Sequence, residues 1–286
     1  MKLSLIAVLV ILCQVLPASS FLASPGSSPA VIRFMSEVPS DEESPPIPEA
    51  SLAGLESVKA DLVSLCSKDP KPSLQEVQRM VRELEEVAEQ IGAGQGSSIS
   101  GLLNGEWELL YSPEDETRAS PFFWAFSKAY PTNADQIFSI TDAIPAPIKE
   151  VGPAYQQIEF SASSQTGSFI SRVKVATLGG LATSMMTTRG SIIKAEGLDG
   201  LRLKIETTKP EESTILQKLG PLGSTINENA PPFPSGEALE RVQPGSSEVV
   251  MLTTFCDDGI RISRNADKPA ETFVWKRSSF ASFEPM

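Results

Sequence analysis

The chain has 286 residues, of which 41% are hydrophobic, enough for one domain of ordinary size with appended segments. It contains no histidine, so the commonest general base and metal ligand are absent; no residue spacing indicates a metal, a cofactor or a catalytic group. A formal net charge of −12 argues against nucleic-acid binding and against electrostatic docking on anionic lipids, so contact with lipid would use apolar surface.

The N-terminus has the features of a two-part targeting sequence. Residues 1–20 combine Lys2, an apolar run and small residues at the end, which predicts a signal peptide rather than a membrane span. Residues 21–36 begin with Phe21, are rich in Ser, Pro and Ala and lack acids, which predicts a transit peptide. This junction resembles the bipartite presequence of algae with secondary plastids and implies a plastid location. A secreted protein with a disordered N-terminal segment is the alternative.

A linker and a helical hairpin are predicted next. Residues 37–50 are acidic and rich in proline, which predicts a disordered linker. The hairpin covers residues 51–96, and its second helix opens with a capping box, Ser73 to Glu76. The first helix places apolar side chains on one face: Leu52, Leu55, Val58, Leu62 and Leu65. We expect this stripe to pack on its own domain, with lipid or a partner protein as the alternative.

The remainder, residues 97–278, is predicted to form an antiparallel β-barrel. Its first strand lies within residues 103–112, where Trp107, Leu109 and Tyr111 alternate with glutamates. Gly105 lets the backbone bend where this strand begins. Further strands are predicted over residues 136–143, 155–162, 168–176, 183–196, 201–208, 248–255, 260–264 and 272–276. The predicted fold is therefore mainly β, a lipocalin-like antiparallel barrel with an N-terminal helical hairpin.

An aromatic segment interrupts the strands. Five aromatic residues fall within ten positions: Phe122, Phe123, Trp124, Phe126 and Tyr130. They predict either a plug helix that caps the barrel or an element that contacts a membrane surface or a ligand at the barrel mouth.

A long segment, residues 210–247, is rich in Pro and Gly and is predicted to be a loop. Within it we expect disorder over residues 227–236 and a short lid or lipid-touching helix over residues 212–219. Residues 279–286 are predicted to be a tail.

Three blocks carry a family resemblance. They are Leu102–Ser112, Ser120–Phe126 followed by Asp135–Phe138, and Thr253–Arg264. In this order they resemble the plastid lipid-associated proteins, or fibrillins, over about Ser51–Arg277. The last block departs from the family pattern at three positions, where Cys256, Gly259 and Asn265 stand. The resemblance implies a non-catalytic protein that binds or coats apolar lipids, such as prenyl quinones, carotenoids or acyl lipids, at thylakoids or plastoglobules.

The pair Gly105 and Trp107, with a late arginine, resembles the lipocalin signature. That resemblance implies that Arg261 or Arg264 lies over Trp107 and closes one end of the barrel through a cation–π contact. The candidate lipid-contacting residues are Trp107, Tyr111, Phe122, Phe123, Trp124 and Phe126.

Other hypotheses stay open. One is a secreted lipocalin-like carrier; another is an enzyme of plastid lipid metabolism that uses Asp257 and Asp258, although a solvated turn before a strand explains that pair more simply. Cys66 and Cys256 are either two free, small apolar residues or a redox-sensitive disulfide.

Overall fold

The computed structural model describes residues 49–142, 149–177, 180–218, 220–221, 223 and 229–278. The predicted signal peptide, transit peptide and tail lie outside these residues, as does the predicted linker up to residue 48.

The hairpin consists of helices α2 (Glu49–Cys66) and α3 (Leu74–Ile91). The predicted capping box is present, because the Ser73 hydroxyl accepts a hydrogen bond from the Glu76 backbone and the Glu76 carboxylate accepts one from the Ser73 backbone. Gly92 ends α3 in the left-handed conformation, with φ 66°. The hairpin buries one face, which includes Leu62 and Leu84.

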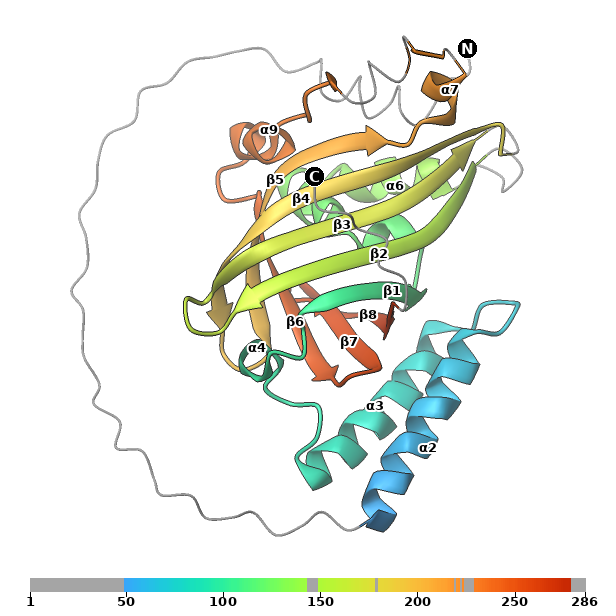
Figure 1. The fold of residues 1–286 in the computed structure, drawn as a ribbon, viewed down its shortest axis with the longest axis vertical. Coiled ribbons are helices and arrows are strands. Elements are labelled where there is room, and N and C mark those ends of the chain that lie inside the picture. The colour runs from blue at the N-terminus through green and yellow to red at the C-terminus, as the bar shows by residue number, and fades with distance from the viewer. Residues whose placement is uncertain are drawn as a thin grey trace, which may run out of the picture. The chain divides into compact units, whose positions relative to one another are not determined.

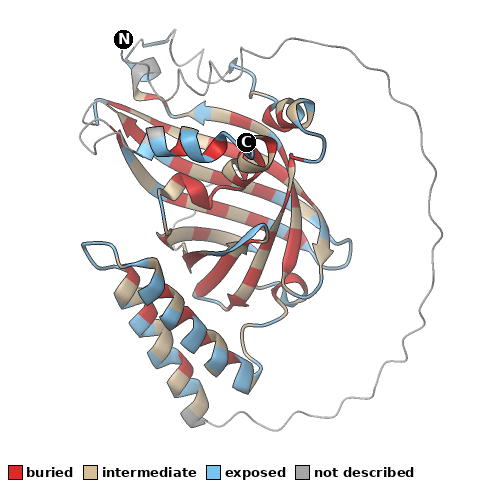
Figure 2. Cartoon of the chain, turned by 180° about the vertical axis from the view of Figure 1, so that it is seen from behind, coloured by how far each residue is buried: buried red, intermediate tan, exposed pale blue. Residues whose placement is uncertain are grey.

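Eight antiparallel strands form one closed barrel in which each strand pairs with its neighbours in chain order and β8 returns to β1 (Figure 1). The predicted mainly β fold with N-terminal helices is confirmed. The strands are β1 (Gly105–Tyr111), β2 (Lys149–Ser161), β3 (Thr166–Thr177), β4 (Ala182–Glu196), β5 (Gly200–Glu211), β6 (Glu248–Cys256), β7 (Ile260–Asn265) and β8 (Lys268–Arg277). In Figure 2 the buried residues follow these strands, whereas the hairpin exposes its outer face.

Short helices follow the hairpin and the first strand. Helix α4 (Ser97–Ser100) precedes β1, and the 3-10 helix η1 (Glu116–Ala119) leads into α5 (Pro121–Ala129), which carries the aromatic segment. Helix α6 (Ala134–Asp142) comes next. It lies against the barrel away from the α2–α3 hairpin (Figure 1).

The strand predicted over residues 136–143 is wrong, because α6 occupies that position. The buried residues Ala134 and Phe138 are four positions apart, so they share one face of a helix. Phe138 packs against the rings of Phe123 and Phe126, with centroid distances of 5.9 and 5.8 Å. The β-rich composition of this stretch therefore reflects burial against α5.

The hairpin packs on the outer wall of the barrel. Leu62 and Leu84 share a buried cluster with Ile262, Val274 and Tyr111, so the apolar stripe faces its own domain, except at Leu52, which is 42% exposed. The predicted alternation of Trp107, Leu109 and Tyr111 fails at its last residue. A register shift between Leu109 and Tyr111 places Tyr111 opposite Val274, so its ring joins the cluster under the hairpin.

The long segment after β5 contains more structure than predicted. Helix α7 (Thr214–Gln217) is short, and α9 (Ser235–Val242) packs on β5. Phe233 forms a β-bridge with Thr208, and the Ser235 and Thr208 hydroxyls are 2.9 Å apart. The predicted disorder over residues 227–236 is therefore wrong for its described part, because these contacts fix the backbone at 233–236 on the barrel.

Candidate functional site

One end of the barrel is closed by a buried arginine between tryptophans. The Arg261 guanidinium lies 5.2 Å from the Trp107 ring centroid and 4.7 Å from that of Trp275. It is fully buried, donates a hydrogen bond to the Gln156 side-chain oxygen and reaches the Met251 sulfur at 3.9 Å. Burial lowers the pKa of Arg261 to about 9. This value is still above neutral pH, so the guanidinium is protonated there.

A second arginine also lies over the Trp107 ring. The Arg277 guanidinium lies 4.2 Å from the ring centroid and donates hydrogen bonds to the backbone oxygens of Leu102 and Asn104. Gly105 has φ 125°, a backbone conformation that favours glycine, and a Cβ atom there would lie 2.6 Å from Arg277 Nη1, so a side chain at this position would displace the guanidinium. The predicted barrel-closing residues Gly105, Trp107 and Arg261 therefore lie together.

Arg264, the other candidate for this role, lies elsewhere. Its Nη1 atom is 2.8 Å from Glu85 Oε1, so it joins the barrel to helix α3. Trp107 has no exposed surface and Tyr111 is buried under the hairpin, so neither of these candidate lipid contacts lies with the aromatic segment.

The remaining lipid-contact candidates lie together on α5. Trp124 and Phe126 are buried, and Trp124 packs on Phe273 inside the barrel at 5.7 Å. The Trp124 indole N–H donates to the Arg118 backbone oxygen at 2.6 Å. Phe122 and Phe123 are partly exposed and contact each other edge to face at 5.2 Å. Helix α5 thus combines a buried face, as a plug helix requires, with aromatic rings that reach the surface.

A cavity of about 220 Å³ lies beside this helix, between α5, α6 and the turn that joins β7 to β8. Its aromatic wall consists of Phe123, Trp124 and Phe138. Its polar lining consists of Glu114, Arg118, Ser127, Asp135, Ser139, Asp142, Asn265, Lys268 and Glu271. Because the floor is buried at Arg118 and the rim is exposed at Asp135, the cavity joins the protein interior to its surface.

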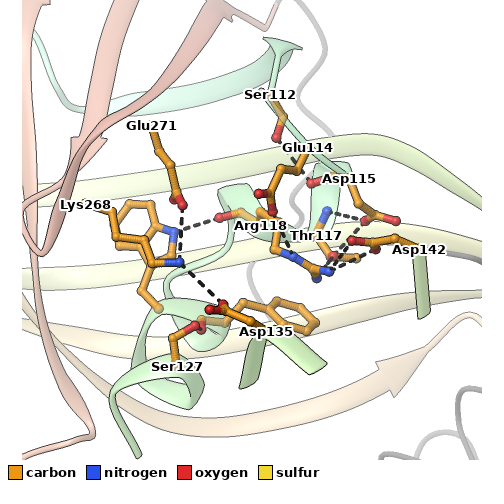
Figure 3. Close-up of polar contacts among 12 residues, drawn as sticks. Ser112, Glu114, Asp115, Thr117, Arg118, Ser127, Asp135, Asp142, Lys268 and Glu271 are labelled. Carbon is orange, nitrogen blue, oxygen red and sulfur yellow. Dashed lines mark hydrogen bonds and ion pairs between the residues drawn. The ribbon is translucent and has the colours of Figure 1, made fainter. Parts of the chain in front are cut away.

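Arg118 occupies the floor of the cavity. Its guanidinium lies 3.8 Å from the Phe138 ring centroid and 5.5 Å from that of Phe123. Its Nη2 atom donates to both carboxylate oxygens of Asp142, at 2.9 and 3.0 Å, and its Nη1 atom donates to Thr117 Oγ1 at 3.0 Å. Figure 3 shows this guanidinium among the acidic side chains of the cavity.

Two further carboxylates face Lys268. The lysine Nζ atom is 3.4 Å from Glu271 Oε1 and 3.9 Å from Asp135 Oδ1, both visible in Figure 3. Burial raises the pKa of Glu271, and the neighbouring Lys268 offsets part of that effect. Below the cavity, Asp115 accepts from Lys149 at 2.7 Å; hydrogen bonds from Lys149 and Thr117 outweigh burial and lower the pKa of Asp115.

Sequence reasoning found the aromatic wall but missed the polar lining. Arg118 lies only three residues before Pro121, so a charged residue next to an aromatic run was the available signal. Lys268 and Glu271 carried no such signal, because the barrel closure alone brings β8 beside α5 and α6. The resulting arrangement can bind a molecule that is part polar and part apolar.

Asp257, considered for catalysis, has structural partners, whereas Asp258 is contacted at its backbone oxygen by Arg277 Nε at 2.8 Å. Asp257 Oδ1 accepts hydrogen bonds from the backbone N–H groups of Gly259 and Ile260, as is usual in a turn. Its Oδ2 atom forms an ion pair with Lys59, 2.5 Å from Nζ. Cys66 and Cys256 are free and buried, and burial raises their pKa values to about 12 and 11. They behave as the small apolar residues of the plainer interpretation.

Two searches of the described residues bear on function. Within them, no group of three or more acidic, cysteine or histidine side chains is arranged to hold a metal ion. Likewise, none of their helices has the length and apolar character needed to cross a bilayer.

A family model described as PAP_fibrillin matches residues 59–276. This match includes the second half of α2, all eight strands but the last residue of β8, and the whole cavity. Comparisons with curated proteins and with solved structures give no match.

Proposed function

The chain belongs to the PAP_fibrillin family of plastid lipid-associated proteins, and on this premise we propose that it is a non-catalytic lipid-binding protein of thylakoids or plastoglobules. The proposed ligands are the apolar lipids and pigments of plastids: prenyl quinones, carotenoids or acyl lipids. The observation that carries the proposal is the aromatic-walled cavity beside α5 and its partly exposed rings.

The cavity suits an amphipathic ligand. Phe123 lines the cavity and Phe122 packs against Phe123, and both are partly exposed. Arg118 lies at the buried floor, with its carboxylate partners Glu114 and Asp142 nearer the surface. Exposed phenylalanine rings gain free energy when their apolar surface leaves water for lipid. The net charge of −12 does not help the protein to approach anionic headgroups, so the rings supply the proposed contact.

Lipid analysis of the purified protein tests the proposal. We expect organic extraction to yield a plastid lipid in near-stoichiometric amount after expression in a plastid-containing host, as measured by mass spectrometry. The double variant Phe122→Ala, Phe123→Ala should lose most of this lipid. Leu198→Ala is the control, because Leu198 is a 61% exposed apolar residue outside the cavity. Absence of lipid from the unchanged protein, together with no binding to vesicles, would refute the proposal.

The proposed route to the plastid is a signal peptide followed by a transit peptide. A fluorescent protein fused to residues 1–36 should enter the plastid of an alga with a secondary plastid, and Phe21→Ala should redirect it. Export of the unchanged fusion from the cell would instead favour the secreted carrier.

A further inference from the structure

We propose that the cavity beside α5 holds a neutral, polyhydroxylated headgroup, as in a glycolipid, and that the acyl chains leave over Phe122 and Phe123. This inference rests on the proposed function, because it names the class of lipid that the same site takes. Three features of the cavity carry it: an unused donor, surplus acceptors, and aromatic faces that are already covered.

The unused donor is the Nε atom of Arg118. The Arg118 side chain is only 7% exposed, and its Nε atom is buried without a hydrogen bond. Glu114 Oε2 lies 3.5 Å away, outside hydrogen-bond geometry. The Glu114 side chain is 54% exposed, so it can move aside and let a ligand oxygen take its place beside Nε, which would give this buried donor an acceptor.

The surplus acceptors are carboxylate oxygens. Glu114, Asp135, Asp142 and Glu271 line the cavity, whereas its cations are Arg118 and Lys268. Two of the ion pairs are long, since Lys268 Nζ lies 3.4 Å from Glu271 and 3.9 Å from Asp135. Each ionised carboxylate has about four acceptor positions, so several remain for donors on a ligand. A hydroxyl group both donates and accepts, so it matches carboxylates and Arg118 Nε together.

Other headgroups match less well. A phosphate or fatty-acid carboxylate would be repelled by the four carboxylates of the cavity. Arg118 would compensate little of this repulsion, because it already forms an ion pair with Asp142. Quinone carbonyls only accept hydrogen bonds, so the carboxylates would give them no partner. A quaternary ammonium group needs open aromatic faces, but Arg118 lies over the rings of Phe138 and Phe123, and Trp124 packs on Phe273.

Vesicle flotation with the purified protein tests this inference. Three vesicle sets share a phosphatidylcholine base and contain diacylglycerol, monohexosyl diacylglycerol or phosphatidic acid with the same acyl chains. We expect binding to the sugar-bearing vesicles to be about tenfold tighter than to the other two, the effect of one hydrogen bond to a charged group. Glu271→Gln and Asp135→Asn should each reduce this preference several-fold. Asp135 is 84% exposed, so its replacement tests the site without disturbing the core.

The matched control is Glu206→Gln, which makes the same change at an exposed position of β5 outside the cavity and should leave the preference unchanged. Equal binding to all three vesicle sets would overturn the headgroup inference and leave the proposed function standing. Preference for phosphatidic acid would overturn it in favour of an anion. A sugar preference that survives both cavity substitutions would show that the headgroup binds elsewhere. Binding to no vesicle, with no extracted lipid, would refute the proposed function itself.

Discussion

Arg261 and Arg118 both lie over aromatic rings, and their surroundings differ. Arg261 is packed between Trp107 and Trp275 and contacts neutral groups. Arg118 lies over Phe138 beside a cavity with four carboxylates, and it keeps one donor unused. The cation–π contacts of Arg261 thus fill the barrel interior, whereas that of Arg118 lies beside a cavity that can bind a ligand. Both arginines keep a buried Nε atom without a hydrogen bond, so neither burial nor an unused donor separates a structural arginine from a binding one, whereas the adjoining cavity and its carboxylates do.

The largest expected effect breaks the closed end. Arg261→Ala removes a fully buried side chain and leaves the Gln156 oxygen without its partner, so we expect about 3 kcal/mol lower stability in urea unfolding. Lipid binding by the folded fraction should be unchanged, because Arg261 does not line the cavity. A loss of binding at full stability would reverse the assignment of the two arginines.

The second effect concerns water access. In a Cys13→Ser background, Cys66 and Cys256 should react with a thiol reagent about a hundredfold more slowly in the native protein than in urea, because burial raises their pKa values to about 12 and 11. A cysteine in place of Ser127, which lines the cavity and is half-buried, should react quickly. Rapid labelling of Cys256 would show that water reaches the interior near Arg261.

The third effect concerns the cavity arginine. Arg118→Lys keeps the positive charge but removes the Nε donor and the two bonds from Nη2 to Asp142. We expect lipid affinity to fall about tenfold in vesicle titrations. Stability should change by no more than about 1 kcal/mol, because the lysine stem still covers Phe138. The opposite result, a large loss of stability with unchanged affinity, would make Arg118 another structural arginine.

The smallest effect is a pH dependence. Burial raises the folded-state pKa of Glu271, so its contribution to stability is fully present below the ordinary glutamate value of 4.5 and is lost as the pH rises through the folded value. Glu271→Gln should remove this dependence and raise stability at pH 7 by less than about 1 kcal/mol. Urea unfolding at several pH values measures it. Asp115, whose pKa is lowered, acts in the opposite direction and loses its contribution as the pH falls.

Much of the fold followed from local patterns. The capping box at Ser73 gave the start of α3, and runs of strand-forming residues between glycines and prolines gave segments of all eight strands. The predicted alternation failed at Tyr111, where a bulge shifts the register. A bulge depends on how two strands pair, so the sequence of one strand does not reveal it. Phe138 was misassigned because a buried helix of nine residues and a strand share the same apolar composition.

The candidate site was less predictable than the fold. Two rings of its aromatic wall, Phe123 and Trp124, come from one short stretch that stood out in the sequence, whereas the third, Phe138, comes from α6 and did not. The charges of the site come from Glu114 before η1, from Arg118 in η1, and from α6 and β8, which only the closed sheet brings together. Arg261 was identified through the resemblance to the lipocalin signature. Trp275, the second ring that Arg261 contacts, was not identified, because that signature includes only the tryptophan of the first strand.

The hairpin sets a limit on how far this protein can be shortened from its N-terminus. Leu55 and Leu62 of α2 cover Ile262 and Val274 on the barrel wall. Removal of residues 1–48 leaves that cover intact, whereas a protease cut within α2 would bare a strip of aliphatic surface and promote self-association. Maturation of the chain must therefore stop short of α2 if the protein is to stay monodisperse in water.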